Sequence, residues 1–323
     1  MSDNSNIYAV TRIHIRENDL LTESFLEQLV QADSYEQCVA MLREKGWGAE
    51  NVDDMSQILE TERDKTWELM REVLHEDIDQ LDIFLIANDY HNLKSAIKEV
   101  KLEHEYEGIY IDQGTVPAET IRDAVRAKEF DRLPEKMAHI AEEALGVFLR
   151  TGDGQLCDTI IDKAGLEALY EAGINSGSDA MKAYAELTVV AADIKIALRA
   201  LRTGKGQEFL EKALAECETL NLGALTKATL AGEEELADYL SATAYADGAA
   251  QFGKSMSAFE RWCDNLLIDR MKVQKWNPFG IDPIAAYVLA RENEIKSVRI
   301  ILSGKLNDLP QDAIRERIRQ TYA

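Results

Sequence analysis

The amino-acid sequence predicts an all-α fold. Ala, Leu, Glu, Lys and Arg are abundant, and only five prolines interrupt the 323 residues, a composition that favours helices. Apolar residues recur at helical spacing, and no segment has the alternating pattern of a β-hairpin. We therefore expect many helices of medium length joined by short loops.

Several helix boundaries can be predicted in chain order. Ser34, with Gln37 three residues later, has the form of a capping box at a helix start. Pro117 and Pro310 stand where the first turn of a helix tolerates a missing N–H. Glycine and proline predict breaks near residues 46–48, 114, 152–154, 173–177, 204–206 and 277–283.

A pattern of a polar residue, an aliphatic residue and a lysine recurs every 101 residues. The copies are Asn92-Leu93-Lys94, Asp193-Ile194-Lys195 and Glu294-Ile295-Lys296. On a helix, this pattern predicts that the aliphatic residues are buried and that the lysines reach solvent. The alternative is that any three amphipathic helices can be slid into some matching register. Helical solenoids repeat about every 34 to 47 residues, so this longer period indicates whole helical bundles.

The third copy departs from the pattern at two positions. Glu292 and Arg299 fall where the apolar stripe of the helix should continue. We therefore expect the packed face of this helix to be narrower than in the other two copies, or rotated.

The charge of the chain limits its partners. The 36 basic and 59 acidic residues give a net charge of −23, which opposes binding to nucleic acid and adsorption to anionic lipid. Docking on basic loops of a membrane protein stays open, as does the plain interpretation that the charge keeps the chain soluble. The polar start, MSDNSN, is unlike a secretory signal, and no run of about 18 apolar residues could span a bilayer.

The four cysteines are widely scattered. Cys38, Cys157, Cys217 and Cys263 form no CxxC pair, so neither a disulfide framework nor a zinc site is expected. Free, mostly buried thiols in a cytoplasmic protein are the expected state.

Several segments resemble the C-subunit family of V-type and archaeal-type ATP synthases, whose eukaryotic relatives are the d subunits. The resemblance covers nearly the whole chain and is weakest in the middle third. Near the start, Thr11 stands where the family frequently has asparagine. The matching segments are residues 277–288 (NPFGIDPIAAYV), 292–299 (ENEIKSVR), 304–305, 309–310, 88–94 (NDYHNLK), 8–12 (YAVTR) and 20–21.

The resemblance implies a fold and a function. The fold would be a funnel of three pseudo-equivalent helical bundles, here residues 1–115, 116–215 and 216–323. The funnel would sit on the membrane rotor ring of proteolipid subunits, receive the tip of the central shaft, and transmit torque coupled to H⁺ or Na⁺ transport. Such a protein is cytoplasmic and peripheral to the membrane. It needs no catalytic, cofactor-binding or metal-binding residue and no small-molecule substrate.

The sequence lacks the common catalytic motifs. Gly204-Lys205-Gly206 has neither the spacing of a phosphate-binding loop nor a preceding strand, and HExxH and GxSxG are absent. Glu72 and His75 could project two ligands from one helix face, but a di-metal carboxylate bundle needs two such motifs and two further glutamates. We expect His75 to be a solvated or capping histidine.

Other residues leave alternatives open. The four tryptophans, Trp47, Trp67, Trp262 and Trp276, are expected to be core anchors rather than the lining of a ligand pocket. The arginines Arg315, Arg317 and Arg319 either contact an acidic partner or complement a helix dipole. Besides a rotary coupling protein, a generic helical scaffold and a metal-dependent helical-bundle enzyme remain as alternative classes.

Overall fold

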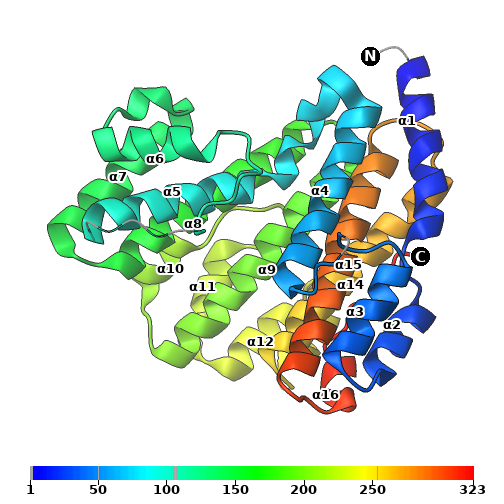
Figure 1. Cartoon of the computed structure of the whole chain (residues 1–323). Helices are drawn as coiled ribbons and strands as arrows, with labels where there is room; N and C mark the ends of the chain where they lie inside the picture. Colours follow the sequence, from blue (N-terminus) through cyan, green and yellow to red (C-terminus); the bar gives the residue numbers. More distant parts are fainter. Residues whose placement is uncertain (1–2, 50, 103, 105, 107, 253) are drawn as a thin grey trace. The chain divides into compact units, whose positions relative to one another are not determined.

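The chain folds almost entirely into helices, as the sequence predicts (Figure 1). The computed structural model describes residues 3–49, 51–102, 104, 106, 108–252 and 254–323. Helices occupy 77% of these residues, and no β-strand occurs among them. The residues form two compact units, each made of segments that are distant in the sequence.

The first unit combines residues up to 79 with residues 178–183 and 247–323, so it contains both ends of the chain. Its helices are α1 (Asp3–Arg16), η1 (Glu17–Asp19), α2 (Glu23–Gln31), α3 (Tyr35–Glu44), α4 (Met55–Leu74), α14 (Met256–Met271), η4 (Lys272–Trp276), α15 (Asp282–Leu306) and α16 (Gln311–Arg315). The helix α13 (Ala246–Phe252) begins one residue before the last segment of this unit.

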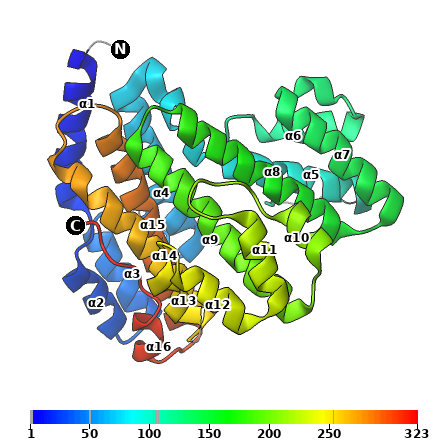
Figure 2. The same ribbon diagram turned by 180° about the vertical axis from the view of Figure 1, so that it is seen from behind.

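The helix α15 forms the core of the first unit. It runs alongside α4, and α16 lies beside α2 near the C-terminal end of α15 (Figures 1 and 2). Its apolar side chains join those of α2, α3 and α4 in one cluster. Seventeen of its residues are buried, so the expectation of a narrower packed face is wrong. The stripe is interrupted only locally, because Glu292 pairs with Arg63 at 2.9 Å and Arg299 faces solvent.

The second unit comprises residues 80–177 and 184–246. Its helices are α5 (Ile86–Leu102), α6 (Ala118–Ala127), η3 (Phe130–Arg132), α7 (Glu135–Thr151), α8 (Gly154–Asn175), α10 (Gln207–Ala213), α11 (Leu222–Ala231) and α12 (Glu233–Ser241). The turn η2 (His75–Phe84) and the long helix α9 (Asp179–Thr203) have residues in both units. The side chains of Leu93 and Ile97 on α5 pack with α6, α7 and α8 in an apolar core.

The helix starts follow local chemistry. Ser34 caps α3 by accepting the N–H of Gln37 at 3.2 Å, and the Gln37 side chain accepts the N–H of Asp33 at 2.7 Å. The first contact is that of the predicted capping box, whereas the second reaches the residue before the cap instead of Ser34 itself. Pro117 and Pro310 are the N-cap residues of α6 and α16.

The three copies of the 101-residue pattern lie on α5, α9 and α15. Leu93, Ile194 and Ile295 are at most 1% exposed, as predicted. The lysines differ from the prediction, because only Lys296 is exposed, whereas Lys94 and Lys195 are half-buried. Lys94 pairs with Asp162 of α8 at 2.5 Å, and this contact holds its ammonium group near the protein surface.

The polar residue of each copy performs the same task. Asn92 accepts the N–H of Ile111 at 2.9 Å, and Asp193 accepts the N–H of Ala215 at 3.1 Å. Glu294 accepts the N–H of Leu21. Each side chain is 3% exposed or less. A buried polar group on each central helix therefore satisfies the backbone of a loop that crosses it.

Candidate functional site

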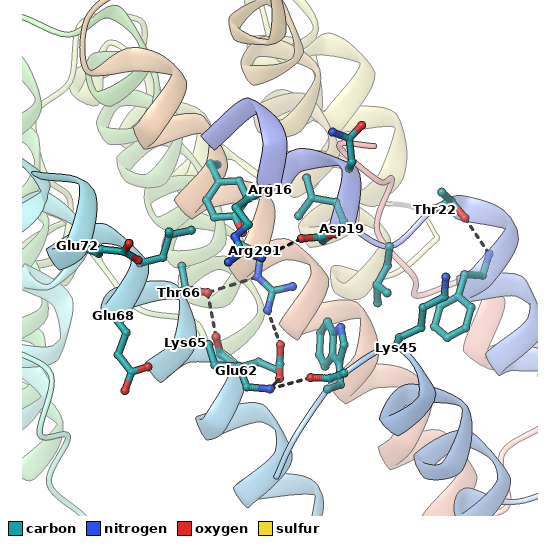
Figure 3. A pocket seen from close by; sticks show the side chains of 18 residues that line it. Arg16, Asp19, Thr22, Lys45, Glu62, Lys65, Thr66, Glu68, Glu72 and Arg291 are labelled. Carbon is teal, nitrogen blue, oxygen red and sulfur yellow. Dashed lines mark hydrogen bonds and ion pairs between the residues drawn. The ribbon is translucent and has the colours of Figure 1, made fainter. Parts of the chain in front are cut away.

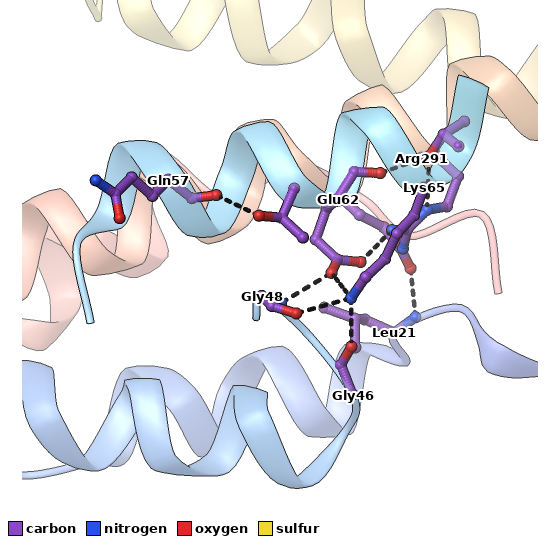
Figure 4. Close-up of polar contacts among 10 residues, drawn as sticks. Leu21, Gly46, Gly48, Gln57, Glu62, Lys65 and Arg291 are labelled. Atoms are coloured by element: carbon purple, nitrogen blue, oxygen red, sulfur yellow. Dashed lines mark hydrogen bonds and ion pairs between the residues drawn. The ribbon is translucent and has the colours of Figure 1, made fainter. Parts of the chain in front are cut away.

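Four charged side chains of the first unit form a cluster, which we call the charged centre; Figures 3 and 4 label three of them, Glu62, Lys65 and Arg291. Glu62 and Lys65 come from α4, and Arg291 and Glu294 come from α15. Glu62, Arg291 and Glu294 are 3%, 7% and 3% exposed. Because burial of an unpaired charge is very unfavourable, the partners of these groups decide what the cluster can do.

The sequence of α4 turns Glu62 inward. The helix begins at the cap residue Asp54, which accepts the N–H of Gln57 at 3.0 Å. Its buried residues include Ile58, Leu59, Glu62 and Thr66, which lie on one face at spacings of three and four. Glu62 therefore shares the face that packs against α15, and its carboxylate needs a cation there.

Arg291 supplies that cation. Its Nη2 donates to Oε2 of Glu62 at 2.6 Å, and its Nη1 donates to Oε2 of Glu294 at 2.6 Å. Its guanidinium lies over the Trp47 ring, 5.1 Å from the centroid. Burial lowers the pKa of Arg291, but the charges of Glu294 and Glu62 raise it more, so the net pKa is raised. The arginine stays cationic between two carboxylates.

The second oxygen of Glu62 fixes the loop between α3 and α4. Its Oε1 accepts the N–H of Gly48 at 2.9 Å and an N–H of Lys65 at 2.7 Å. The Lys65 ammonium also donates to the carbonyl oxygens of Gly46 and Gly48, at 2.8 and 2.9 Å. Both glycines have positive φ angles, +80° and +75°, which glycine adopts without strain. Figure 4 shows this loop held against α4.

Glu294 ties the segment before α2 to α15. Its Oε1 accepts the N–H of Leu21, the residue before the cap Thr22. Burial raises the pKa of Glu294 to about 7, against the lowering effects of the Arg291 charge and the Leu21 N–H. Burial also raises the pKa of the neighbouring Tyr287 to about 12, so this phenol is neutral at physiological pH.

An open pocket of about 710 Å³ lies over the charged centre, lined only by residues of the first unit. Its lining carries charges of both signs, including Arg16, Asp19, Lys45, Glu68 and Glu72 (Figure 3). Because neither sign dominates, the pocket has no clear preference for an anion or a cation.

The chemistry of the charged centre is structural. Two cations face two carboxylates, and these groups also contact the backbone of Leu21, Gly46 and Gly48. Arg291 further contacts the Thr66 hydroxyl at 3.4 Å and the Trp47 ring. The hydroxyl group of Thr66, which lines the pocket, donates a hydrogen bond to the carbonyl oxygen of Glu62 at 2.9 Å. The centre therefore holds separate segments of the chain in register on α15, a role for which buried ion pairs are suited.

The sequence pattern identifies one member of this centre. It singles out Glu294 as the polar residue of the third copy, and it assigns Glu62, Lys65 and Arg291 to no site. The available signal is the presence of Arg291, Glu292 and Glu294 in a helix that is otherwise largely apolar. The partner Glu62 lies 229 residues away in the sequence, so no local pattern connects it to Arg291.

The possible metal pair is not formed. The helix α4 ends at Leu74, and His75 follows it with a φ angle of 51°, so Glu72 and His75 do not share a helix face. Glu72 instead pairs with Arg12 at 2.9 Å, and His75 is an exposed C-cap residue. No group of three or more His, Cys, Asp or Glu side chains suited to a metal ion occurs in the described part of the chain.

The tryptophans differ from the expectation of four core anchors. Trp47 and Trp67 are 5% and 4% exposed, as expected. Trp262 is half-buried and stacks on Phe259 with centroids 6.1 Å apart. Trp276 is 87% exposed, so the expectation is wrong for this residue.

The C-terminal arginines mostly make contacts within the chain. Arg315 pairs with Glu27 of α2 at 2.6 Å. Arg319 is 8% exposed and pairs with Asp264 of α14 at 2.8 Å. These pairs attach the end of the chain to α2 and α14, and of the three arginines only Arg317 lacks an ion pair among the described residues.

The cysteines and the hydropathy agree with the sequence analysis. All four cysteines are free, and Cys38 and Cys157 are buried. Within the described residues, no helix combines the length and apolar character that a bilayer crossing requires.

The described residues form an all-helical protein, and the charges of its charged centre pair with one another. These features describe a protein whose buried charged residues have a structural role. The chain belongs to the ATP synthase (C/AC39) subunit family, whose model matches residues 9–317. This finding agrees with the resemblance carried by residues 277–299.

Curated relatives match over almost the full length. The C subunit of the A-type ATP synthase of Methanocaldococcus jannaschii is 22% identical, with 95% of this chain and 84% of that protein covered. The C subunit of the V-type ATP synthase of Thermus thermophilus is 24% identical, with 96% and 97% covered. The C subunit of the V-type sodium ATPase of Enterococcus hirae is 22% identical, with 95% and 96% covered.

Proposed function

We propose that this chain is the non-catalytic central-stalk subunit of a rotary V/A-type ATP synthase. It links the central shaft of the soluble motor to the membrane rotor ring of proteolipid subunits and transmits torque. The rotation couples ATP synthesis or hydrolysis to the transport of H⁺ or Na⁺. The family match over residues 9–317 carries this proposal, and the names of the relatives, ATP synthases and a sodium ATPase, support it.

The contacts within the first unit suit a part that bears load. Torque transmission needs a body that resists deformation, and a free terminal segment would act as a soft element. Here the charged centre ties Leu21 and the 46–48 loop to α15 through charged groups. Arg315 and Arg319 attach the other end of the chain to α2 and α14. Hydrogen bonds to charged groups are stronger than neutral ones. The better-buried contacts of Glu294 and Arg319 therefore stiffen the two ends, and the exposed Arg315 pair adds little.

We infer three pseudo-equivalent bundles, residues 1–115, 116–215 and 216–323, arranged as a funnel. The supporting observation is that Asn92, Asp193 and Glu294 each accept a backbone N–H from a crossing loop. The third loop comes from Leu21, near the start of the chain. This contact between the N-terminal segment and the third copy supports a closed arrangement of three bundles.

The partners of the chain follow from this function. The shaft subunits and the proteolipid ring are its contacts, and the chain is peripheral to the membrane through the complex. The ring selects the transported ion, so this chain is compatible with either H⁺ or Na⁺.

The test is affinity purification of the tagged chain from solubilised native membranes, followed by measurements on the recovered complex. We expect shaft and ring subunits in stoichiometric amounts, and hydrolysis that drives ion pumping. Removal of the chain should leave hydrolysis by the soluble motor and abolish pumping, because the link between the two is missing.

Two other results would contradict the proposal. Recovery of a complex that contains neither shaft nor ring subunits would identify a scaffold of another assembly. A stoichiometric metal ion together with hydrolysis by the isolated chain would identify an enzyme.

A further inference from the structure

The most exposed large apolar side chain among the described residues is that of Trp276, at 87%. It ends the turn η4, and Val273 and Phe279 on either side are 64% and 58% exposed. Ile15 of α1 is 60% exposed. We call the exposed side chains of Val273, Trp276 and Phe279 the Trp276 surface. All belong to the first unit, and both views place residues 272–281 beside α1 (Figures 1 and 2).

The segment that carries Trp276 is anchored. The carbonyl oxygen of Asn277 lies 3.2 Å from Nε2 of His14 on α1. The Asn277 side chain accepts the N–H of Phe279 at 3.1 Å and donates to Gln274 at 2.9 Å. The Lys275 ammonium lies over the ring of the buried Tyr322, 4.8 Å from its centroid. The exposed aromatic residues therefore stand on a fixed backbone, which lowers the entropy cost of binding.

The charge around Trp276 is opposite to that of the whole chain. Residues 270–279 contain Arg270, Lys272 and Lys275 and no acidic residue, whereas the chain carries a net charge of −23. Lys272 lies 3.4 Å from Asp269, but this pair is largely exposed and therefore weak. A partner that fits this surface has exposed apolar side chains that are surrounded by acidic residues.

We propose that the Trp276 surface is a docking site for an acidic protein surface with apolar side chains, supplied by another protein of the rotary complex. The proposal rests on the proposed function, because it requires that complex. Tryptophan and arginine are enriched at interface centres, where a few such residues supply most of the binding energy.

Two other occupants fit the surface less well. An anionic bilayer would attract the three basic residues but repel the remainder of a chain that carries 59 acidic residues. A symmetric dimer through this surface would place residues 270–279 of two copies against each other, with like charges opposed.

The experiment places the photo-crosslinking residue p-benzoylphenylalanine at position 276 in the full chain. The tagged chain is assembled in cells, irradiated and purified from solubilised membranes, and the adduct is identified by mass spectrometry. We expect an adduct with a peptide of another ATP synthase subunit in which Asp and Glu outnumber Lys and Arg. The control carries the crosslinker at position 149, where Leu149 of the second unit is 43% exposed, and should give little of that adduct.

The outcomes separate this inference from the proposed function. An intact complex with no adduct at position 276, or with equal adducts at both positions, overturns the docking site and leaves the proposed function standing. An adduct with lipid or with a second copy of this chain overturns it in favour of that occupant. A chain that recovers no ATP synthase subunit overturns both.

Substitutions give an independent measurement. The double variant Trp276→Ala, Phe279→Ala should weaken binding to a complex that lacks this chain by about 30-fold or more, with an unchanged thermal unfolding curve. Arg270→Glu with Lys272→Glu should slow association and remove its dependence on salt. Leu149→Ala is the matched control and should bind normally. Normal binding by the Trp276 double variant would overturn the docking site.

Discussion

Asn92 on α5 and Asp193 on α9 each accept a loop N–H at the same place in the 101-residue pattern, but they differ in one hydrogen bond. Asn92 accepts the N–H of Ile111 and also donates to the carbonyl oxygen of Ile111, at 2.9 and 2.8 Å. Asp193 accepts the N–H of Ala215 at 3.1 Å through Oδ1, while its buried Oδ2 has no hydrogen-bond partner among the residues that the structure describes. A carboxylate cannot donate, so Asp193 makes no counterpart of the hydrogen bond from the amide of Asn92 to Ile111.

The first prediction concerns the pH dependence of stability. Burial raises the pKa of Asp193 to about 7, against the lowering effects of the Ala215 N–H and the Lys163 charge. In the unfolded chain the pKa is about 3.9, so the folded state binds more protons between these values. The stabilisation is present below the lower value and is lost as pH rises through the upper one.

The variant Asp193→Asn should remove this loss, because its amide is uncharged at every pH and its oxygen can still accept the N–H of Ala215. Its free energy of unfolding, minus that of the native chain, should grow by on the order of 2 kcal/mol between about pH 5 and pH 8. Denaturant titrations at the two pH values measure the difference, from which the contributions of all other carboxylates cancel. A difference that does not change with pH would contradict the prediction.

The exchanged substitution Asn92→Asp is the matched test on α5. It places a carboxyl group where Asn92 contacts Ile111, so it should create a pH-dependent loss of stability of the same sign. The double variant Asn92→Asp, Asp193→Asn should again be pH-dependent. If Asn92→Asp is equally stable at low and high pH, the two positions are not equivalent.

The next prediction concerns the charged centre. Arg291→Met removes the cation that Glu62 and Glu294 share and leaves two carboxylates in the interior. We expect a destabilisation of about 3–5 kcal/mol. Replacement of both glutamates by glutamine in the Arg291→Met background should recover part of this loss, because the uncompensated charges are then gone.

The control for Arg291 is Arg315, which also bridges two carboxylates but at the surface. Its side chain is 42% exposed, so Arg315→Met should cost about 0–1 kcal/mol. Chemical unfolding of both variants in one buffer gives the comparison. If Arg291→Met and Arg315→Met lower the free energy of unfolding equally, burial does not decide how much an arginine ion pair contributes to stability.

A further prediction links the packed core to coupling. Leu93→Ala and Ile194→Ala each remove a fully buried aliphatic side chain and should cost on the order of 2–5 kcal/mol. In the assembled complex, a softened bundle should reduce ion pumping more than ATP hydrolysis, because hydrolysis occurs elsewhere. Both rates are measured on the same preparation, with Lys296→Ala as an exposed control. Losses in strict proportion would contradict torque transmission through this chain.

The last prediction concerns chemistry. The isolated chain should neither hydrolyse ATP nor bind a metal ion, because Glu72 pairs with Arg12 and His75 lies outside the helix. Elemental analysis by mass spectrometry and a phosphate-release assay test both statements. A metal ion that is lost on Glu72→Ala or His75→Ala would revive the metal-dependent class.

The sequence determined the local and periodic features of this protein. The capping box at Ser34 depends on groups a few residues apart, and the helical period of Leu93, Ile194 and Ile295 directs these side chains into the core. The equal spacing of Asn92, Asp193 and Glu294 indicated related positions, and each proved to be a buried acceptor for a loop N–H.

Tertiary contacts decided the remainder. One partner of Arg291, Glu62, lies 229 residues away, and no local spacing could indicate which of 59 acidic residues would join Glu294 beside it. Two tryptophans became core residues and Trp276 became a surface residue, since aromatic type alone does not fix burial. The physical reason is that helix propensity and hydrophobic periodicity depend on residues that are close together in the sequence. Burial and charge pairing depend on which helices pack against each other.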